Sequence, residues 1–406
     1  MKQYYRSKEI YTENGIVDGY LVVDNGIITN IKDKSFVVNE YVDYQNYKIL
    51  PGIFDTHNHG TYGWSLLSDY ASQDHNIEIK GYLRALLSQG VTSVLPTAHT
   101  SFFSELAKIK EENDPDEANI IGIHSEGPWL NRVGEKGKKS ENPYPPVLLE
   151  TAQKMVKNAN GQLVMVGLAP EIEGIDEIMD YFLANNVKLA VAHTDGNYEI
   201  TKKAIDRGIT VATHMCNVMT GIHHRDFGCL GACLTDNRVW AELICDGLHV
   251  CNEMLDFVYK SKGRDNIMMI SDCTGLSGLK PGLYNSAALG GVINVTEDGY
   301  VLDENGRLRG SSMPVIYGMA NLVKNLAIPL TDVVKMASHN PALCHGCLNH
   351  KGSLTRGKDA DFIIVDNDIT LHKTYLNGKL VYDKQLEHDY FSPYAKKLLF
   401  SDMSEK

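Results

Sequence analysis

The sequence predicts a (β/α)₈ TIM-like barrel joined to a small β-sandwich domain that is formed from both ends of the chain. Eight short apolar runs alternate with helical spacers in the middle of the sequence, β-hairpin patterns occur at both ends, and polar or ionisable residues end most of the runs. With 406 residues the chain is long enough for one barrel of roughly 250 residues and a smaller domain.

Both ends of the chain carry β-hairpin patterns. Residues 20–31 are two β-rich runs joined by Asp24-Asn25-Gly26, a combination that favours a tight turn with positive φ. Residues 374–382 repeat this style around Asn377-Gly378, after the apolar run 360–366. Because isolated hairpins are only marginally stable, we expect the two ends of the chain to pair with each other.

This pairing divides the sequence into two expected domains. Residues 1–50 and 345–406 form the small β-domain, and residues 51–344 form the barrel inserted between them. Near the second boundary, Cys344-His345-Gly346-Cys347 has the spacing of a redox or zinc knuckle, but no second pair of this kind completes four ligands. We interpret this motif as the end of a helix.

The middle of the chain carries the barrel pattern. The eight apolar runs are residues 49–55, 91–99, 120–126, 163–171, 189–193, 210–214, 240–246 and 267–272. Eight strands with helical connections are what a (β/α)₈ barrel requires, and catalytic residues lie at the C-terminal ends of its strands. A doubly wound open sheet is the main alternative, but it would not gather polar ends from all eight strands around one point.

Two histidines, His57 and His59, follow the first apolar run. In an extended strand, residues i and i+2 face the same side, and imidazole is a common ligand for divalent metals. A surface loop with two histidines by chance is the alternative interpretation of this motif alone. In a barrel, however, six strand-end residues converge on one pocket: His57, His59, Glu126, His193, His214 and Asp272. Three or more such ligands can hold a divalent metal ion.

Composition excludes some classes of partner. The net charge of −12 argues against a general nucleic-acid binder or a protein that binds anionic membranes. No stretch approaches the ~18 apolar residues of a membrane span, and the N-terminus lacks the apolar segment of an export signal. We therefore expect a cytoplasmic protein whose eight cysteines are reduced.

Short motifs recur in a fixed order along nearly the whole chain. They are residues 51–60, 124–130, 192–195, 213–219, 246–250 and 271–273, followed by 338–342 and 357–362. Their order and spacing resemble the amidohydrolase superfamily and, within it, the N-acetylglucosamine-6-phosphate deacetylase family. Each motif is short, so the resemblance depends on the whole series.

The resemblance implies a set of metal ligands. Glu126, His193 and His214 would bind the principal ion, with Glu126 replacing the carboxylated lysine that bridges two metals in many relatives. His57 and His59 are both present, so a second ion is possible. Histidine and carboxylate ligands suit zinc, iron, manganese or cobalt, and one or two such ions are expected.

The resemblance also implies that Asp272 is first the general base and then the general acid. An acetamide has a poorly electrophilic carbonyl and a poor leaving group. A divalent metal lowers the pKa of bound water towards ~7 and can polarise the carbonyl. Asp272 would take the proton of that water and pass it to the departing amine. A capping or salt-bridging role for Asp272 is the alternative.

Substrate contacts are also implied by the resemblance. They are Asn217, the backbone near Val218, Arg225, His249 and the loop that contains Leu308, Arg309 and Gly310. Guanidinium suits phosphate because it offers paired hydrogen bonds, and Arg225 is a candidate to reach the neighbouring subunit of a homodimer. The alternative is that Arg225, beside two histidines in a loop, is simply solvated.

One departure bears on the substrate. The family usually has Lys-Gly-x-His after the Glu-Gly-Pro motif, whereas this chain reads Lys136-Gly137-Lys138-Lys139. Lys139 could donate to the oxyanion, the substrate could differ, or this loop could align differently. We therefore expect a metal-dependent deacetylase acting on N-acetylglucosamine 6-phosphate or a related N-acetyl amino sugar phosphate. The alternatives are hydrolysis of another amide or cyclic amide, and a non-catalytic barrel that binds a sugar phosphate.

Overall fold

A closed barrel of eight parallel strands forms the centre of the computed structural model, which describes residues 2–67, 74–131, 144–286, 289, 291–386, 388–393 and 395. The barrel strands are β6 (Ile53–Asn58), β9 (Val91–Pro96), β11 (Ile123–Glu126), β12 (Leu163–Leu168), β13 (Lys188–Val191), β14 (Ile209–Ala212), β15 (Trp240–Ile244) and β16 (Ile267–Ile270). Parallel bridges from Thr97 to His124 and from Asn58 to Cys273 join the two runs of paired strands. Each of the eight predicted runs therefore overlaps a barrel strand.

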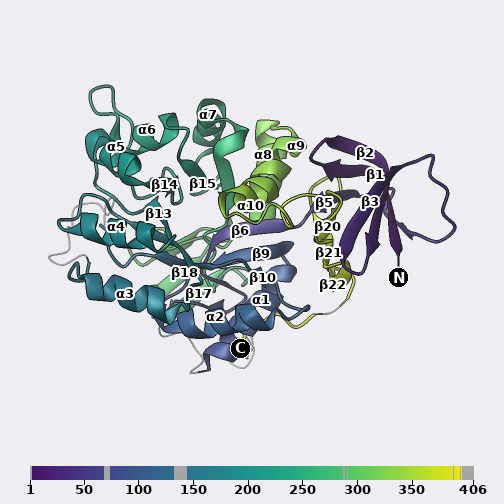
Figure 1. The fold of residues 1–406 in the computed structure, drawn as a ribbon, viewed down its shortest axis with the longest axis horizontal. Helices are drawn as coiled ribbons and strands as arrows, with labels where there is room; N and C mark the ends of the chain where they lie inside the picture. The colour runs from purple at the N-terminus through teal and green to yellow at the C-terminus, as the bar shows by residue number, and fades with distance from the viewer. Residues whose placement is uncertain are drawn as a thin grey trace.

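Helices surround the barrel (Figure 1). They are α1 (His75–Leu87), α2 (Phe103–Glu112), α3 (Leu149–Asn158), α4 (Ile175–Ala184), α5 (Tyr198–Arg207), α6 (Gly228–Thr235), α7 (Asn252–Lys262), α8 (Val315–Leu326), α9 (Leu330–Val334) and α10 (Asn340–Cys344). Helix α1 shows why they form where they do: the Asp74 side chain accepts from the backbone N–H groups of Asn76 and Ile77. Its apolar face, with Ile79 and Leu83, is buried. None of the described helices combines the length and apolar composition that a membrane-spanning helix needs.

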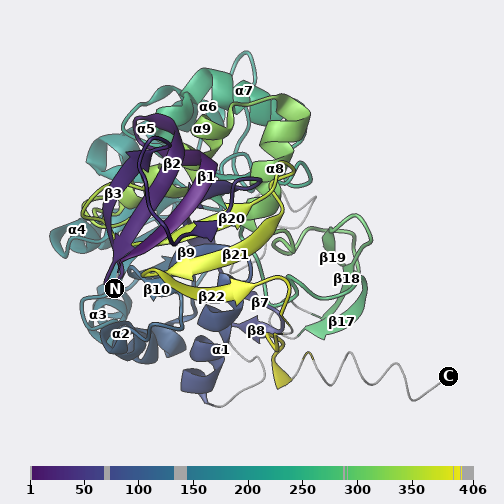
Figure 2. The same ribbon diagram turned by 90° about the vertical axis from the view of Figure 1, so that its right-hand side faces the viewer.

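The two ends of the chain form the predicted small β-domain, whose strands belong to one sheet (Figure 2). Its strands are β1 (Gln3–Thr12), β2 (Gly15–Asp24), β3 (Ile27–Asp33), β4 (Val42–Asp43), β5 (Lys48–Pro51), β20 (Phe362–Val365), β21 (Leu371–Leu376) and β22 (Lys379–Asp383). They form one sheet in the order β22-β21-β20-β5-β1-β2-β3, with β4 beside β1. Tyr5, Phe362 and Tyr375 belong to its buried core. Both predicted hairpin turns occur, with positive φ at Asn25 and Asn377.

The first predicted run, 49–55, is divided between the two sheets at Gly52. Residues before it pair with β20 in the terminal sheet, and residues after it pair with β9 in the barrel. A Cβ atom at Gly52 would lie 2.1 Å from the Oγ1 atom of Thr92, so only glycine fits this crossing point. The close approach places the start of β6 directly against β9.

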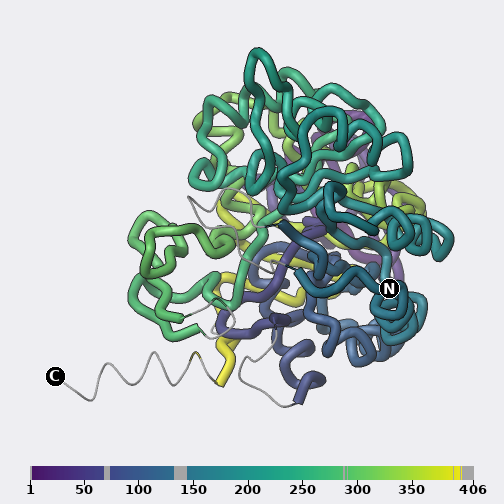
Figure 3. Tube along the Cα trace, turned by 90° about the vertical axis from the view of Figure 1, so that its left-hand side faces the viewer, coloured from purple at the N-terminus to yellow at the C-terminus, as the bar shows by residue number. Residues whose placement is uncertain are grey.

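A small antiparallel sheet follows β16 and was not predicted. Its strands are β17 (Gly282–Ser286), β18 (Gly291–Val295) and β19 (Val301–Asp303), and Figure 3 shows them in green at the edge of the barrel. Ala395 belongs to its buried cluster. The Trp64 indole donates to the Tyr390 carbonyl at 2.7 Å, and the Ser392 N–H donates to the Tyr62 carbonyl at 2.9 Å. The chain after β22 thus returns to the barrel.

Candidate metal centre

The six predicted ligand and base residues lie at the C-terminal ends of barrel strands. His57 is the next-to-last residue of β6, His59 lies just beyond the strand, and Glu126 is the last residue of β11. His193, His214 and Asp272 each follow their strand by two residues. Because the strands are parallel, all these ends share one rim of the barrel, as the sequence predicted.

These residues form two groups that could each hold a metal ion. One group contains Glu126, His193 and His214, and the other contains His57, His59 and Asp272. Within each group, the possible ligand atoms all lie within 4.8 Å of one another. Nitrogen and oxygen donors at this spacing fit a first-row divalent ion.

Glu126 lies between the two groups and turns one carboxylate oxygen to each. Its Oε1 atom lies 3.0 Å from His193 Nε2 and 2.9 Å from His214 Nε2. Its Oε2 atom lies 3.3 Å from His59 Nε2 and 3.6 Å from His57 Nε2. One carboxylate can therefore reach both candidate ion positions.

Asp272 faces the histidine pair. Its Oδ1 atom lies 3.4 Å from the Nε2 atoms of both His57 and His59, and these two Nε2 atoms are 3.1 Å apart. On its other side, His59 Nδ1 lies 3.0 Å from the Thr97 carbonyl oxygen. A carbonyl accepts only, so Nδ1 carries the hydrogen and Nε2 has the lone pair that a metal needs.

Charge at the centre is balanced between carboxylates and imidazoles. Burial alone would raise the pKa of Glu126, but the charges of His57 and His193 hold it well below its usual value. Burial also opposes ionisation of Asp272, and His57 and His59 hold its pKa below the usual value. Burial would lower the pKa of His57, but Glu126 and Asp272 raise it well above the ordinary value. Carboxylates whose pKa values are held low in this way suit a divalent cation, which binds the ionised form.

The backbone at the rim adopts conformations that are unusual for non-glycine residues. The φ angles are 44° at His193, 31° at His214 and 51° at Asp272, and Cys216 and Val218 are also positive. Such residues cost of order 1–3 kcal/mol each and concentrate at functional sites. The surrounding fold holds the ligands in place against this cost.

A buried network beneath the centre was missed by the sequence reasoning. The Asp55 carboxylate accepts from the Ser271 hydroxyl at 2.5 Å and from the Asn58 side-chain amide at 3.1 Å. These bonds connect β6 with the end of β16, one residue before Asp272. Burial raises the pKa of Asp55 to about 6, although its bonds to Ser271 and Asn58 act in the opposite direction. Its position two residues before His57 was the available sequence signal.

Several predicted substrate residues gather beside the centre. His249 lies with Nδ1 2.7 Å from Asp246 and with Nε2 3.2 Å from the Gly310 carbonyl oxygen. The Ser311 N–H donates to the Asp272 carbonyl at 2.9 Å, so the predicted 308–310 loop adjoins the base. Asn217 donates to the His214 carbonyl at 3.2 Å. The Val218 carbonyl accepts from the Thr194 N–H at 3.0 Å.

Other predicted substrate residues are placed differently. Arg225 lies in an exposed loop, where its guanidinium is 2.9 Å from His224 Nε2. Arg309 pairs with Asp303 of β19 at 2.8 Å, and Leu308 is partly exposed. Lys139 lies outside the described residues. Arg225 and Arg309 thus each contact a residue close to them in the sequence.

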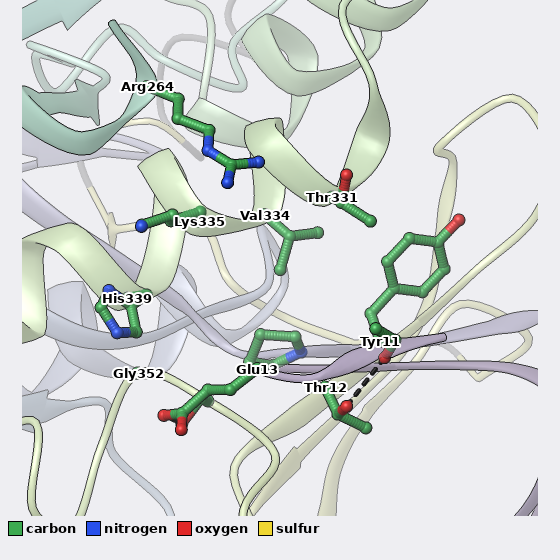
Figure 4. A pocket seen from close by; sticks show the side chains of 12 residues that line it. Tyr11, Thr12, Glu13, Arg264, Thr331, Val334, Lys335, His339 and Gly352 are labelled. Carbon is green, nitrogen blue, oxygen red and sulfur yellow. Dashed lines mark hydrogen bonds between the residues drawn. The ribbon is translucent and has the colours of Figure 1, made fainter. Parts of the chain in front are cut away.

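A cavity of about 280 Å³ lies at the opposite end of the barrel, beside the terminal sheet (Figure 4). Pro51, which precedes β6, and Arg264, which precedes β16, both line it. Its charged side chains are paired: Arg264 with Asp332 at 2.5 Å, Lys335 with Asp265 at 2.5 Å and Glu13 with Lys358 at 2.9 Å. Because the described metal-centre residues do not line this cavity, we place the chemistry at the other rim.

The comparisons with known proteins agree with this geometry. A relative from Vibrio furnissii, an N-acetylglucosamine-6-phosphate deacetylase, is 30% identical over 342 residues, which are 82% of this chain and 83% of the relative. An N-acetylgalactosamine-6-phosphate deacetylase from Escherichia coli O157:H7 is 28% identical, with 94% of this chain and 99% of the relative covered.

A solved structure and a family model extend the comparison. The crystal structure of N-acetylglucosamine-6-phosphate deacetylase from Pasteurella multocida matches with a TM-score of 0.83 and 26% identity, over 94% of this chain and 99% of that one. The model of the amidohydrolase family matches residues 49–381, which include the whole barrel and all six residues of the metal centre. This chain therefore belongs to the amidohydrolase family.

Proposed function

We propose that the protein is a metal-dependent deacetylase that hydrolyses the acetamide of N-acetylglucosamine 6-phosphate, or of a related N-acetyl amino sugar phosphate, to acetate and the free amine. The observation that carries the proposal is the position of the Asp272 carboxylate in the group of His57 and His59, which Glu126 connects to the group of His193 and His214. The relatives with deacetylase names support the substrate class. The protein would act in amino sugar metabolism.

Two ion positions are proposed. Glu126, His193 and His214 would hold the principal ion, and His57 and His59, with Glu126 shared, would hold a second. A bound divalent metal would supply a water of lowered pKa and would polarise the amide carbonyl. Zinc, iron, manganese and cobalt all suit these donors.

Asp272 would move the protons of the reaction. Its carboxylate is ionised at neutral pH because His57 and His59 lower its pKa despite burial. It can therefore accept the proton of the attacking water and then deliver it to the nitrogen of the departing amine. The bonds from the Asp272 backbone to His57 and Ser311 fix where this carboxylate points.

Recognition of the sugar phosphate would fall to the residues around the rim. His249 lies beside the loop of Gly310, and Asn217 lies beside His214, so both can contact a substrate bound at the ions. For Arg225 we propose a contact with the phosphate in the partner subunit of a homodimer, since its loop is exposed. Lys139 stays a candidate donor to the oxyanion.

A different amide is the second candidate substrate. The observation in its favour is the absence of a histidine from Lys136-Gly137-Lys138-Lys139. A non-catalytic sugar-phosphate-binding barrel is the candidate of another class, and the retained position of Asp272 speaks against it. One relative is named for N-acetylgalactosamine 6-phosphate and another for N-acetylglucosamine 6-phosphate, so both sugars are candidates for the substrate.

We also propose a cytoplasmic location and a division of the chain into two domains. The eight cysteines are free thiols in the structure, which supports a cytoplasmic location. The domain division proposed is residues 1–50 with 345–406 as the small β-domain and residues 51–344 as the barrel, with the described residues after β22 packed back against the barrel.

The test is metal analysis combined with an acetate-release assay on both the glucosamine and the galactosamine 6-phosphates. We expect bound divalent metal and turnover on at least one of them. In Asp272→Asn, the principal ion, which Glu126, His193 and His214 would hold, should be retained while kcat falls by roughly 10²–10⁴-fold. Asp265→Asn, a change at the other end of the barrel, is the matched control. Bound metal with turnover only on another amide would refute the substrate, and substantial activity of Asp272→Asn would refute its role.

A further inference from the structure

Glu242 is a buried carboxylate that lies behind the histidine pair, and neither the predicted ligands nor the predicted base include it. We propose that Glu242 is a positioning residue for the second ion: it fixes the ring and tautomer of His57 and thereby sets the affinity of that ion position. The inference rests on the two-ion centre of the proposed function and adds a residue that acts through a ligand.

The contacts of Glu242 join β15 to β6. Its side chain is fully buried, and its Oε1 atom accepts from the Thr56 hydroxyl at 2.6 Å. Its Oε2 atom lies 3.5 Å from His57 Nδ1. Two oxygens of one carboxylate thus contact two consecutive residues of the strand that carries His57. The Thr56 contact fixes the carboxylate, so its second oxygen has one position relative to the ring.

The consequence for His57 follows from its two ring nitrogens. A carboxylate accepts only, so Nδ1 carries the hydrogen that points to Glu242 and Nε2 keeps its lone pair. That Nε2 atom lies 3.6 Å from Glu126 Oε2 and 3.1 Å from His59 Nε2, inside the candidate centre. A carboxylate behind a ligating histidine orients the ring and raises its basicity, and its loss typically costs 10–100-fold in metal affinity.

The two histidines of the pair are supported differently. His59 has the neutral Thr97 carbonyl behind it at 3.0 Å, whereas His57 has the carboxylate of Glu242. The charged support makes His57 the ligand whose strength depends on a single buried side chain. The effect of Glu242 should therefore be specific to the second ion. Of the three ligands of the principal ion, only Glu126 also reaches the second ion position.

The backbone of Glu242 also contacts the principal ligand group. Its carbonyl accepts from the N–H of Met215 at 2.7 Å, directly after His214, whose φ is 31°. Substituting the side chain leaves this backbone bond in place. A side-chain variant should thus separate the two ion positions, which a general loss of structure would not do.

The experiment measures the affinity of each ion, using zinc and a competing chelator, in the whole protein. We expect Glu242→Gln to keep the tighter ion at wild-type affinity and to bind the second ion 10–100-fold more weakly. In a His57→Ala background, Glu242→Gln should cause no further loss, because its effect passes through that ring. The matched control is Glu117→Gln, the same change at a buried carboxylate that pairs with Arg84 far from the ligands.

The outcomes separate this inference from the proposed function. Wild-type affinity of Glu242→Gln for both ions, or an equal loss at both, overturns it, and so does an additive loss in the His57→Ala background. If Glu242→Gln does not fold, Thr56→Val removes the donor that holds the carboxylate, and a several-fold loss at the second ion alone is then expected; no loss overturns the inference. A wild-type protein that binds one ion yet releases acetate refutes the role of Glu242 and leaves the deacetylase intact.

Discussion

Replacing Glu78 by glutamine should stabilise the protein at neutral and alkaline pH. Glu78 lies in the first turn of α1, is 1% exposed and accepts from the Ser65 N–H at 2.7 Å. Burial raises its pKa from 4.5 to about 7, even though the bond from Ser65 acts to lower it. A glutamine oxygen can accept the same bond and carries no charge.

The direction and size of this change in the free energy of unfolding follow from the pKa values of Glu78 in the unfolded and the folded chain. Below pH 4.5 the carboxyl is protonated in both the folded and the unfolded chain, so it contributes no pH dependence. Between 4.5 and about 7 the unfolded chain loses the proton first, so the free energy of unfolding falls as pH rises. Above pH 7 the full cost, about 3 kcal/mol at ~1.4 kcal/mol per pKa unit, is present. Glu78→Gln removes this cost.

Urea unfolding of the wild type and of Glu78→Gln, at intervals from pH 4.5 to 8, measures the difference. The advantage of the variant should grow by about 3 kcal/mol over this range. Glu150→Gln is the control, because Glu150 is exposed and Lys154 lowers its pKa, so a small change of opposite sign is expected. A difference that stays constant with pH, or that shrinks as pH rises, would show that the fold does not hold Glu78 protonated.

Three other perturbations have defined outcomes. Gly310→Ala should lower kcat/KM roughly 10–100-fold without changing metal content. A Cβ atom there would lie 2.5 Å from Thr274 Cγ2 and 3.2 Å from the Asp272 carbonyl oxygen, so the loop beside the base must shift. Unchanged kinetics would contradict this prediction. Tyr375→Phe should lower the free energy of unfolding by about 1–3 kcal/mol, measured in urea, because it leaves the buried Tyr44 hydroxyl without its 2.6 Å partner. Removing metal with a chelator should lower the Tm, and adding metal back should restore it. A free ion concentration of 100 times the Kd stabilises the folded protein by about 3 kcal/mol. A Tm that does not respond to chelator would speak against a resident ion.

The barrel and the convergence of its strand-end residues were predictable from the sequence for one physical reason, whereas the roles of those residues as ligands were implied by the family resemblance. Strands buried on both faces are apolar and β-branched, so the eight runs could be recognised, and parallel strands bring their C-terminal ends to one rim. That rule alone gathers residues as distant in sequence as His57 and Asp272. It does not determine whether one or two ions bind.

The supporting residues were not predictable in the same way. Glu242 and Asp55 are buried carboxylates whose partners lie on other strands, and only the register around the barrel decides which groups they meet. The β17–β19 sheet was missed because its strands are short and much of one face is exposed, as at Leu283, so the apolar signal is weak. The return of Tyr390 to the barrel rests on contacts between residues far apart in the sequence, among them the hydrogen bond from the Trp64 indole.

The antiparallel pairing of β5 with β20 has a consequence for how the chain is made. Leu50 pairs with Ile363, more than three hundred residues later, so the edge of β5 has no partner until the last part of the chain leaves the ribosome. At about 5–20 residues per second this delay is roughly 15–60 s, and an unpaired apolar strand edge is prone to aggregate. The edge of β5 therefore stays unpaired for longer than that of β6, whose partner Cys273 is made well before residue 362, and a chain that ends before residue 362 keeps the edge of β5 open.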